Sequence, residues 1–454
     1  MRNEEACSSD DDRNRTPCTS WDYNQSSVLH DDVMGPYTPD IHTVRIEKGK
    51  SMDDYSIHGI ADVKRELDDR EALYYGQDHS NGLVEPGFST VSMNEVDTAW
   101  GTKTVEVKFT DPLLHGYSVL IVSDTVPEGY DIESDEYINA HGIVPERITT
   151  MVMRFPRCIL PEVNTHRVFS RNSASSRARS FKTTIRPIME DAYVPLFTEN
   201  KKGMGGDWVT APVYSQAAKY WLEDRDMAVW STLRMLLGDD NMLTDDGTKV
   251  TIENIGKHWE PLIDKYMTAY RNGDTDGMPS IHKQNANRLI EPFMWHEALV
   301  TSTYWSNFLN LRINKAAQPE ITALAILVRH ALMYGSTPKK NWVHLPFGNP
   351  DALPMDDWGG ISDSLLMASS ECARISYKDR SNMGNRDDVE LGRKLLEQKH
   401  MSPFEHIAFD LNSDALLDSP VMEPLRDAMN EHGVQSNLSP SWLQYRRVVS
   451  AKEQ

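Results

Sequence analysis

The chain has 454 residues, of which 39% are hydrophobic and 25% are charged, and its formal net charge is −21. This length and apolar content can supply one large core or two, and the negative charge argues against a general nucleic-acid-binding protein, because a polyanion favours a broad basic face. No run approaches the roughly 18 apolar residues of a membrane span, and the N-terminus lacks the apolar core of a secretory signal, so we expect a cytoplasmic protein without membrane association.

The first hundred residues hold 21 acidic and nine basic residues, and the first fifty are rich in Asp, Ser, Asn and Pro without periodicity. This composition predicts a largely disordered or loosely attached acidic extension over residues 1–100. The four cysteines form neither a CxxC pair nor a disulfide-rich pattern, so we expect free thiols and no structural metal site. They are Cys7, Cys18, Cys158 and Cys372.

The remaining sequence predicts an α+β fold. Stretches rich in β-branched residues indicate strands at 104–109, 118–122 and 148–155. From about residue 210 the spacing becomes helical and ends at Gly238, a residue type that commonly follows a helix. Further helices are expected at 252–270, 285–300, 301–313, 318–334 and 386–399, and a linker rich in Pro and Gly at 335–363.

One basic segment, "NTHRVFSRNSASSRAR" at 164–179, contrasts with the acidic chain. Ser and Asn compete with helical hydrogen bonds, so residues 170–179 are expected to form a loop. Its hydroxyl and guanidinium groups suit a phosphate, although a solvated basic loop with surface ion pairs has the same composition.

The spacing within this segment resembles a family signature. His166-Arg167, seven residues and then Ser175 resemble the Arg-His-Arg, seven residues, Ser motif of the flavin-dependent thymidylate synthases, with Thr165 in place of the first arginine. Residues 301–320 resemble the family's long helix, in which Asn307 and Arg312 match the motif Asn-Phe-Leu-x-Leu-Arg. Arg288 in "NRLIEP" stands where the family has a second nucleotide-contacting arginine.

Two further elements occur in an unusual order. "ECARISY" at 371–377 and "KHMSPFEHIAFD" at 399–410 resemble family elements that normally precede the arginine motif, whereas here they follow it. A circular permutation explains the order, since rearrangements at surface termini are tolerated. The resemblance, which covers roughly 148–187, 285–334 and 368–410, therefore implies the family's mixed sheet packed with long helices, in permuted form. The catalytic domain would be divided into residues 101–345 and a relocated part, 346–454.

The resemblance also implies a reaction and roles for the matching residues. The reaction is reductive methylation of dUMP to dTMP with FAD, NADPH and 5,10-methylenetetrahydrofolate, without an enzymic nucleophile, in a homotetramer. Arg312 would act in catalysis and contact the uracil, because a guanidinium stabilises delocalised negative charge. The other roles are nucleotide binding by Ser175, Arg177 and Arg288, and flavin binding by His166, Arg167, Asn307, Ser402 and His406.

Alternatives remain open for each motif and for the product. Arg312 could be a charge that favours a helix C-terminus, and Ser402 with Glu405 could form a capping box. Thr165, Thr301, Thr303 and Ser173 stand at positions where the family has other polar or charged residues. The same fold could instead make a 5-hydroxymethyl pyrimidine nucleotide from dUMP or dCMP, and a descendant without catalysis could bind nucleotides or nucleic acid.

Overall fold

A seven-stranded, mostly antiparallel sheet lies at the centre of the protein. The computed structural model describes residues 91–97, 103–110, 114–130, 146–175, 181–203, 208–314, 316–354, 357–376, 386–414 and 437–451, which belong to one compact unit. The strand order is β1-β2-β3-β4-β6-β5, and β7 pairs in parallel with β3. These strands are β1 (Val91–Asp97), β2 (Lys103–Phe109), β3 (Ser118–Val126), β4 (Ile148–Pro156), β5 (Ser170–Ser173), β6 (Trp295–Ser302) and β7 (Lys339–Lys340).

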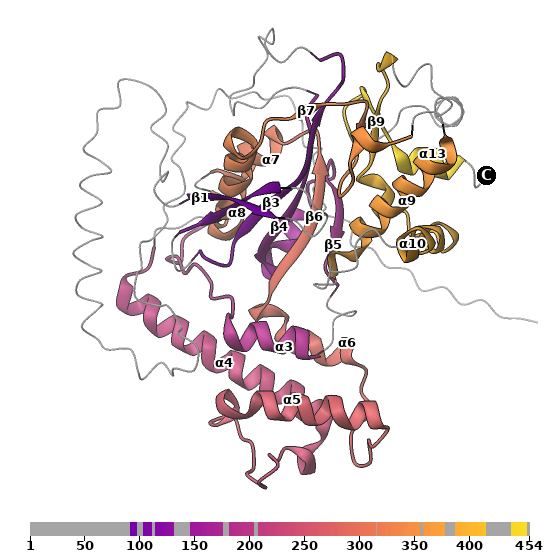
Figure 1. The fold of residues 1–454 in the computed structure, drawn as a ribbon. Helices are drawn as coiled ribbons and strands as arrows, with labels where there is room; N and C mark the ends of the chain where they lie inside the picture. The colour runs from indigo at the N-terminus through magenta and orange to yellow at the C-terminus, as the bar shows by residue number, and fades with distance from the viewer. Residues whose placement is uncertain are drawn as a thin grey trace, which may run out of the picture. The chain divides into compact units, whose positions relative to one another are not determined.

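Two helices cover one face of this sheet (Figure 1). They are α7 (Ser306–Arg312) and α8 (Pro319–His330), and α8 continues into a π-helical turn, η6 (Ala331–Gly335). Alternate residues of the central strands, such as Met151 and Val300, join Leu324 and Val328 of α8 in the largest apolar core. The period of two along a strand places these side chains on one face and their neighbours on the other.

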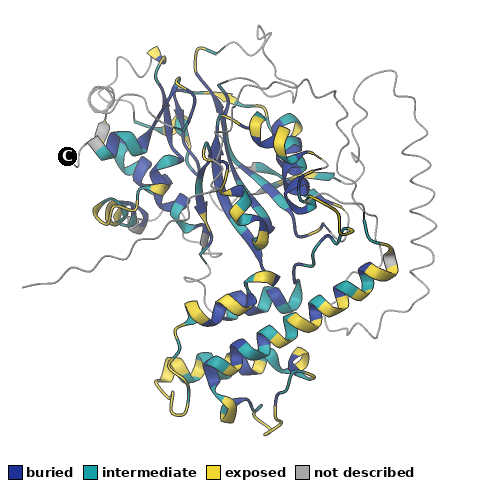
Figure 2. Cartoon of the chain, turned by 180° about the vertical axis from the view of Figure 1, so that it is seen from behind, coloured by how far each residue is buried: buried dark blue, intermediate teal, exposed yellow. Residues whose placement is uncertain are grey.

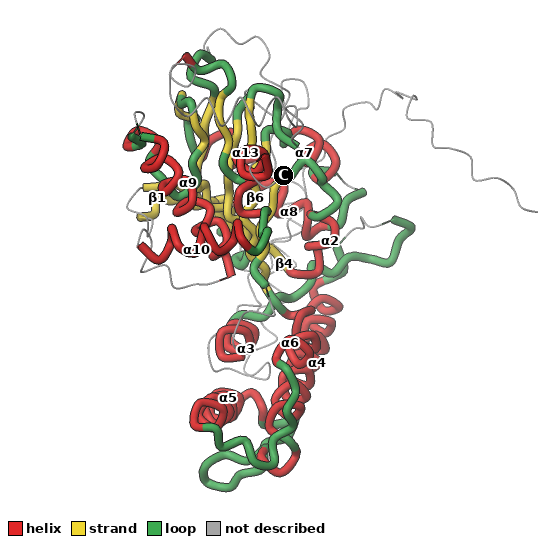
Figure 3. Tube along the Cα trace, turned by 90° about the vertical axis from the view of Figure 1, so that its right-hand side faces the viewer, coloured by secondary structure: helices red, strands yellow, loops and turns green. Residues whose placement is uncertain are grey.

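The opposite face is covered by the C-terminal block, by which we mean the described residues from Val343 onward. It contains a three-stranded sheet of β8 (Val343–His344), β9 (Ala408–Asp410) and β10 (Trp442–Gln444), with α9 (Trp358–Ala373), α10 (Arg386–Glu397) and α13 (Tyr445–Ala451). Leu299 of β6 packs against Cys372 and Ile375 of this block. Figure 3 shows the central sheet between α7 and α8 on one side and α9 and α10 on the other.

A helical lobe is inserted between β5 and β6. It consists of α3 (Phe181–Glu190), α4 (Ala211–Leu237), α5 (Ile255–Asn272), α6 (Lys283–Ala286) and η5 (Asn287–Phe293), with a core of its own. Figure 2 shows exposed residues along the outer sides of these helices. Among the described residues, no helix combines the length and apolar content needed to cross a membrane.

The three predicted strands are confirmed as β2, β3 and β4, and four predicted helices as α4, α5, α8 and α10. Gly238, with φ at 80°, follows α4 as the sequence indicated. The helix predicted at 301–313 is confirmed only from Ser306 onward. The linker predicted at 335–363 is wrong in part, because it contains β7, β8 and the start of α9.

Two other predictions were wrong where tertiary contacts outweighed local preference. Residues 295–302 lie in β6, although a helix was predicted at 285–300, because the strand is covered on both faces and its apolar run carries no strand-like alternation. The predicted loop at 170–179 begins with β5, because Ser170 and Asn172 are buried with partners in the C-terminal block.

The acidic extension predicted at 1–100 contains β1, which pairs along its whole length with β2. Residues 1–90 lie outside the described part of the chain.

Candidate functional site

Arg312 lies at the end of α7 and contacts the segment that carries the arginine motif. Its Nε donates to His166 Nε2 at 2.9 Å, its Nη2 donates to Thr165 Oγ1 at 3.2 Å, and its Nη1 forms an ion pair with Glu162. Glu162 belongs to the short helix α2 (Leu160–Val163). Two predicted site residues that are 146 positions apart in the chain, His166 and Arg312, are therefore in direct contact.

His166 is held as a neutral ring. It is 6% exposed, and it packs on Phe169 and Phe308 with ring centroids 5.5 and 5.0 Å away. Burial, with the charges of Arg312 and Arg171, lowers the pKa of His166 to about 4. Its Nε2 accepts a hydrogen bond from Arg312, so the proton of the neutral ring is on Nδ1.

Thr165 stands where the resembling family has an arginine, and its hydroxyl has two partners. It donates to the carbonyl oxygen of Glu162 at 2.7 Å and accepts from Arg312. The short side chain leaves room for the Arg312 guanidinium to reach the motif. Arg312 thus brings a positive charge to the position from which one is missing in the sequence.

Both C-terminal elements contact β5, which lies within the arginine motif that runs from His166 to Ser175. Asn172 donates to the carbonyl oxygen of Cys372 in "ECARISY" at 3.1 Å. Gln444 Nε2 joins Ser170 Oγ at 2.9 Å to the carbonyl oxygen of Glu405 at 3.0 Å, within "SPFEH". The 3₁₀ turn η9 (Ser402–Glu405) also packs on β5. These C-terminal elements, which are more than 190 positions away in the sequence, therefore lie beside β5 in the fold.

A chain of hydroxyl and imidazole groups fills the interface between the central sheet and the C-terminal block. We call it the threonine–histidine chain: Thr125, His344, Thr150, Thr301 and His406. Its links run from Thr125 to His344 Nδ1 (2.8 Å), from His344 Nε2 to Thr150 (2.7 Å), from Thr150 to Thr301 (2.6 Å) and from Thr301 to His406 Nδ1 (2.8 Å). Both histidines are fully buried, and burial lowers the pKa of each to about 3.

These two histidines make the free energy of unfolding depend on pH. Below the unfolded pKa of about 6.5, the unfolded chain binds protons that the folded interface excludes, so stability falls as the pH is lowered towards the folded values near 3. We expect a loss of about 1 kcal/mol per histidine between pH 6.5 and 5.5, or about 2 kcal/mol for the pair. His166 and His330, each with a pKa lowered to about 4, act in the same direction.

Urea unfolding at pH 6.5 and 5.5 measures this effect. His406→Asn should reduce the pH-dependent loss by roughly 1 kcal/mol, whereas His400→Asn, at an exposed position, should leave it unchanged. Equal stability of the wild-type chain at the two pH values would mean that the interface does not exclude protons.

The predicted phosphate-binding residues Ser175 and Arg288 lie where β5 ends and β6 begins. Ala174 N donates to the carbonyl oxygen of Glu297, which places Ser175 near the start of β6. Arg288 precedes this end of β6 in η5, is half exposed, and is paired with Glu291. Arg177 lies outside the described residues.

A shallow pocket opens at this end between α3 and the sheet. Arg154, Thr184, Asp191 and Glu297 are among the residues that line it. Burial would raise the pKa of Asp191, but its hydrogen bond with His115 and the charges of His115 and Arg154 outweigh burial and lower it. With Arg154 already paired to Asp191 and a second carboxylate beside it, these groups do not suit a phosphate.

The predicted flavin-binding residues differ in accessibility. Arg167 and Asn307 are exposed next to His166 and Phe308, which pack on each other. Ser402 is exposed on η9, whereas His406 is buried against Thr301 and its Nε2 has no partner among the described residues. The guanidinium, amide and hydroxyl groups at the surface are donors that suit the carbonyl and phosphate oxygens of a flavin nucleotide.

Neither cysteine of the described residues is an activated nucleophile. Cys372 is buried in an apolar cluster. Cys158 is at the surface, but desolvation of its sulfur together with the charge of Glu320 raises its pKa to about 11, so it is a thiol at neutral pH. Within the same part of the chain, no group of three or more His, Cys, Asp or Glu residues is placed to hold a metal ion.

Sequence reasoning missed Glu162 and Gln444. Glu162 lies four positions before His166, and an acidic residue so close to a basic motif is a signal of charge pairing that could have been used. Gln444 gives no such signal, because its partners Ser170 and Glu405 are far away in the sequence.

Comparison with models of known families and with curated proteins gives no match for this chain.

Proposed function

We propose that this chain is an enzyme of the flavin-dependent thymidylate synthase type, which transfers a one-carbon group from methylenetetrahydrofolate to C5 of a pyrimidine deoxynucleotide. The observation that carries the proposal is the convergence of separate motifs. Both C-terminal elements are held against β5, within the arginine motif, and Arg312 of the Asn307–Arg312 helix contacts His166 at the beginning of that motif. This proximity in space of motifs far apart in the sequence supports the proposal.

Arg312 would bind the edge of the pyrimidine and stabilise negative charge that develops on the ring. The contact with His166 supports this role, because a neutral imidazole that accepts from Nε fixes the guanidinium plane without cancelling its charge. Arg167 and Asn307 would orient the flavin from their exposed positions, and Ser402 would add a hydroxyl. FAD would supply one-carbon and hydride transfer when bound, with NADPH as reductant.

The predicted nucleotide-binding arginines have separate partners. Arg312 bonds Glu162, Thr165 and His166, whereas Arg288 pairs with Glu291. We propose that a complete site combines Arg312 from one copy with Ser175 and Arg288 from another. The homotetramer implied by the resemblance would supply such shared sites.

A reconstitution experiment tests the reaction. Purified full-length protein is mixed with FAD, and the gel-filtered sample is examined for flavin absorbance. It is then incubated with dUMP or dCMP, methylenetetrahydrofolate and NADPH, and the product is analysed by mass. A methylated nucleotide supports reductive methylation. A hydroxymethylated nucleotide supports the second candidate, which the substitutions Thr165, Thr301 and Thr303 favour because they change polar groups expected at the flavin. A colourless protein that binds DNA with a steep salt dependence would contradict both.

Subunit complementation tests the shared site. Arg312→Ala and Arg288→Ala are each expected to be inactive alone. After the two variants are mixed under conditions that exchange subunits, some sites combine an intact Arg312 with an intact Arg288, and activity should return. If activity stays absent while mass analysis shows mixed oligomers, the site is not divided between copies.

A further inference from the structure

The long helix α4 carries a row of apolar side chains on its outer side. Val213, Tyr220 and Met227 are 54%, 54% and 47% exposed, and they follow each other at intervals of seven residues. Seven residues are almost two turns of a helix, so these side chains lie along one line. The opposite side of α4 carries buried residues such as Val229 and Leu233, which pack in the core of the helical lobe with residues of α3 and α5. Figure 3 shows α3 and α5 on one side of α4.

Small or polar residues lie between these apolar ones, each four positions after an apolar residue. They are Ala217, Asp224 and Ser231. The intervals along the row are therefore alternately four and three residues, which is the repeat by which two helices pack along a common line. The row extends for about 27 Å along the helix. We call it the α4 seam: Val213, Ala217, Tyr220, Asp224, Met227 and Ser231.

Two copies of the α4 seam fit each other better in antiparallel than in parallel orientation. In a parallel pair identical positions meet, so Asp224 would face the partner's Asp224 and the like charges would repel each other. In an antiparallel pair the large residues meet the small or polar ones. Met227 then lies against the partner's Ala217, and Tyr220 lies against the partner's Asp224.

The hydroxyl group of Tyr220 adds polar complementarity to the antiparallel pair. Gln216 Nε2 donates a hydrogen bond to this hydroxyl oxygen at 2.7 Å. The O–H hydrogen of Tyr220 can therefore donate to a carboxylate, and Asp224 is exposed on the same seam. Because a twofold axis relates the copies, this contact would form twice in each pair.

We propose that the α4 seam is the contact surface for a second copy of this chain, whose α4 packs on it in antiparallel orientation about a twofold axis. This surface lies on the helical lobe, and the inference does not depend on the proposed one-carbon chemistry. Apolar side chains that are exposed one by one are common on protein surfaces. If the seam were no more than that, its residues would have no influence on the number of copies in the assembly.

The mass of the full-length protein in solution, measured by size-exclusion chromatography with light scattering, tests the contact. Tyr220→Glu places a second carboxylate against the partner's Asp224, so the dissociation constant of the pair should rise at least ~100-fold. The mass of the assembly should then fall by half. Tyr270→Glu is the matched control, because Tyr270 is 68% exposed on α5 and lies outside the seam. Far-UV circular dichroism checks that both variants are folded.

A disulfide tests the orientation of the two helices. Ala217→Cys and Met227→Cys are combined in a chain in which Cys7, Cys18 and Cys158 are replaced by Ser. The two introduced positions are about 15 Å apart along one helix, too far for a disulfide within one copy. In the antiparallel pair each lies against the other position of the partner, so oxidation should give a covalent dimer. Neither substitution alone should give one.

Each outcome decides for or against the inference. An assembly that Tyr220→Glu halves, together with a covalent dimer of the double cysteine variant, supports it. A monomeric wild-type chain overturns it, whether residues 1–90, another protein or solvent then covers the seam. An assembly that Tyr220→Glu leaves intact overturns it as well, and a covalent dimer of either single cysteine variant would indicate parallel packing and contradict the proposed orientation. None of these results bears on flavin binding or on the product of the reaction, so the proposed function is tested separately.

Discussion

Arg312→Ala is expected to lower turnover of the pyrimidine nucleotide by about 100- to 1000-fold, the usual effect of removing one preorganised group that stabilises charge in the transition state. Arg312 has three partners in the motif segment, so its removal also frees His166 and Glu162. Because Glu162 is partly exposed, water can replace the lost partner and the chain should stay folded. Single-turnover rates with saturating nucleotide measure the effect on chemistry.

A matched arginine elsewhere controls for loss of an ion pair. Arg186 pairs with Glu260 in the helical lobe, and Arg186→Ala should keep the wild-type rate. Arg312→Lys keeps the charge but not the planar fork, so its rate should lie between those of the wild type and the alanine variant. Wild-type turnover in Arg312→Ala would contradict the assignment of Arg312 to catalysis.

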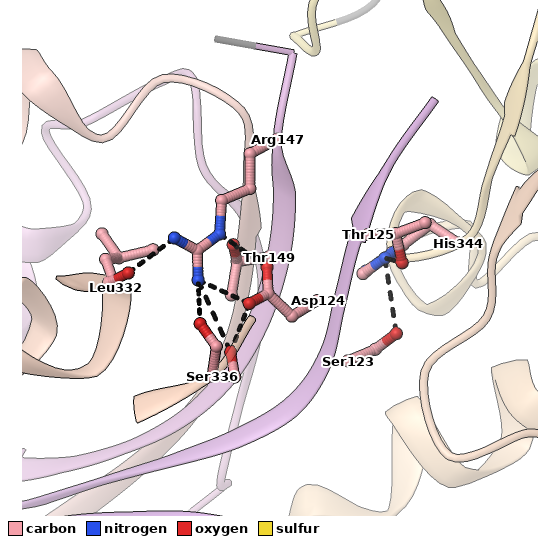
Figure 4. A network of polar contacts seen from close by, with 8 residues as sticks. All are labelled: Ser123, Asp124, Thr125, Arg147, Thr149, Leu332, Ser336 and His344. Atoms are coloured by element: carbon pink, nitrogen blue, oxygen red, sulfur yellow. Dashed lines mark hydrogen bonds and ion pairs between the residues drawn. The ribbon is translucent and has the colours of Figure 1, made fainter. Parts of the chain in front are cut away.

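Arg147→Met is expected to destabilise the fold by about 3 to 5 kcal/mol, because it leaves a buried carboxylate without its partner. Arg147 and Asp124 have side chains only 3% and 5% exposed. As Figure 4 shows, the guanidinium joins Asp124 to Leu332, within η6, and to Ser336, directly after η6. The pair therefore links β3 and the start of β4 to the turn after α8. Urea unfolding at pH 7.5 gives the free energy of unfolding.

The double variant Arg147→Met with Asp124→Leu is the informative control. Removing both charges avoids the unpaired carboxylate, so the double variant should be more stable than Arg147→Met alone. Arg393→Ala removes an ion pair with Asp363 that lies at the surface, and it should have no measurable effect. If Arg147→Met has the same free energy of unfolding as the wild type, the buried ion pair does not stabilise the packing of η6 against the sheet.

β3 shows which features the local sequence specifies and which features depend on the tertiary structure. Asp124 points to Arg147, while Ser123 and Thr125 point across the strand to His344 (Figure 4). The strand itself was predictable from the sequence. β-branched residues are frequent in its first half, and Gly116 and a turn lie on either side of the strand. Its partners were not, since Arg147 and His344 come from segments whose approach depends on the whole sheet.

The candidate site was predictable as a set of motifs but not as an arrangement. His166, Asn307 and Arg312 were identified by spacing, and the structure brings His166 and Arg312 together. The ion pair with Glu162 was not foreseen, and neither was the position of Ser175 beside the start of β6. Spacing along a chain does not encode which end of a strand a residue occupies until the register is known.

The sequence alone determined the α+β class, the three strands predicted from β-branched residues, and the long helix that ends before Gly238. These features depend on local periodicity and backbone preference, which neighbouring residues suffice to specify. Only the tertiary structure decided that residues 295–302 form a strand and that the C-terminal block lies against β5. The physical reason is burial: contacts from distant segments outweigh a local preference of a few tenths of a kcal/mol per residue.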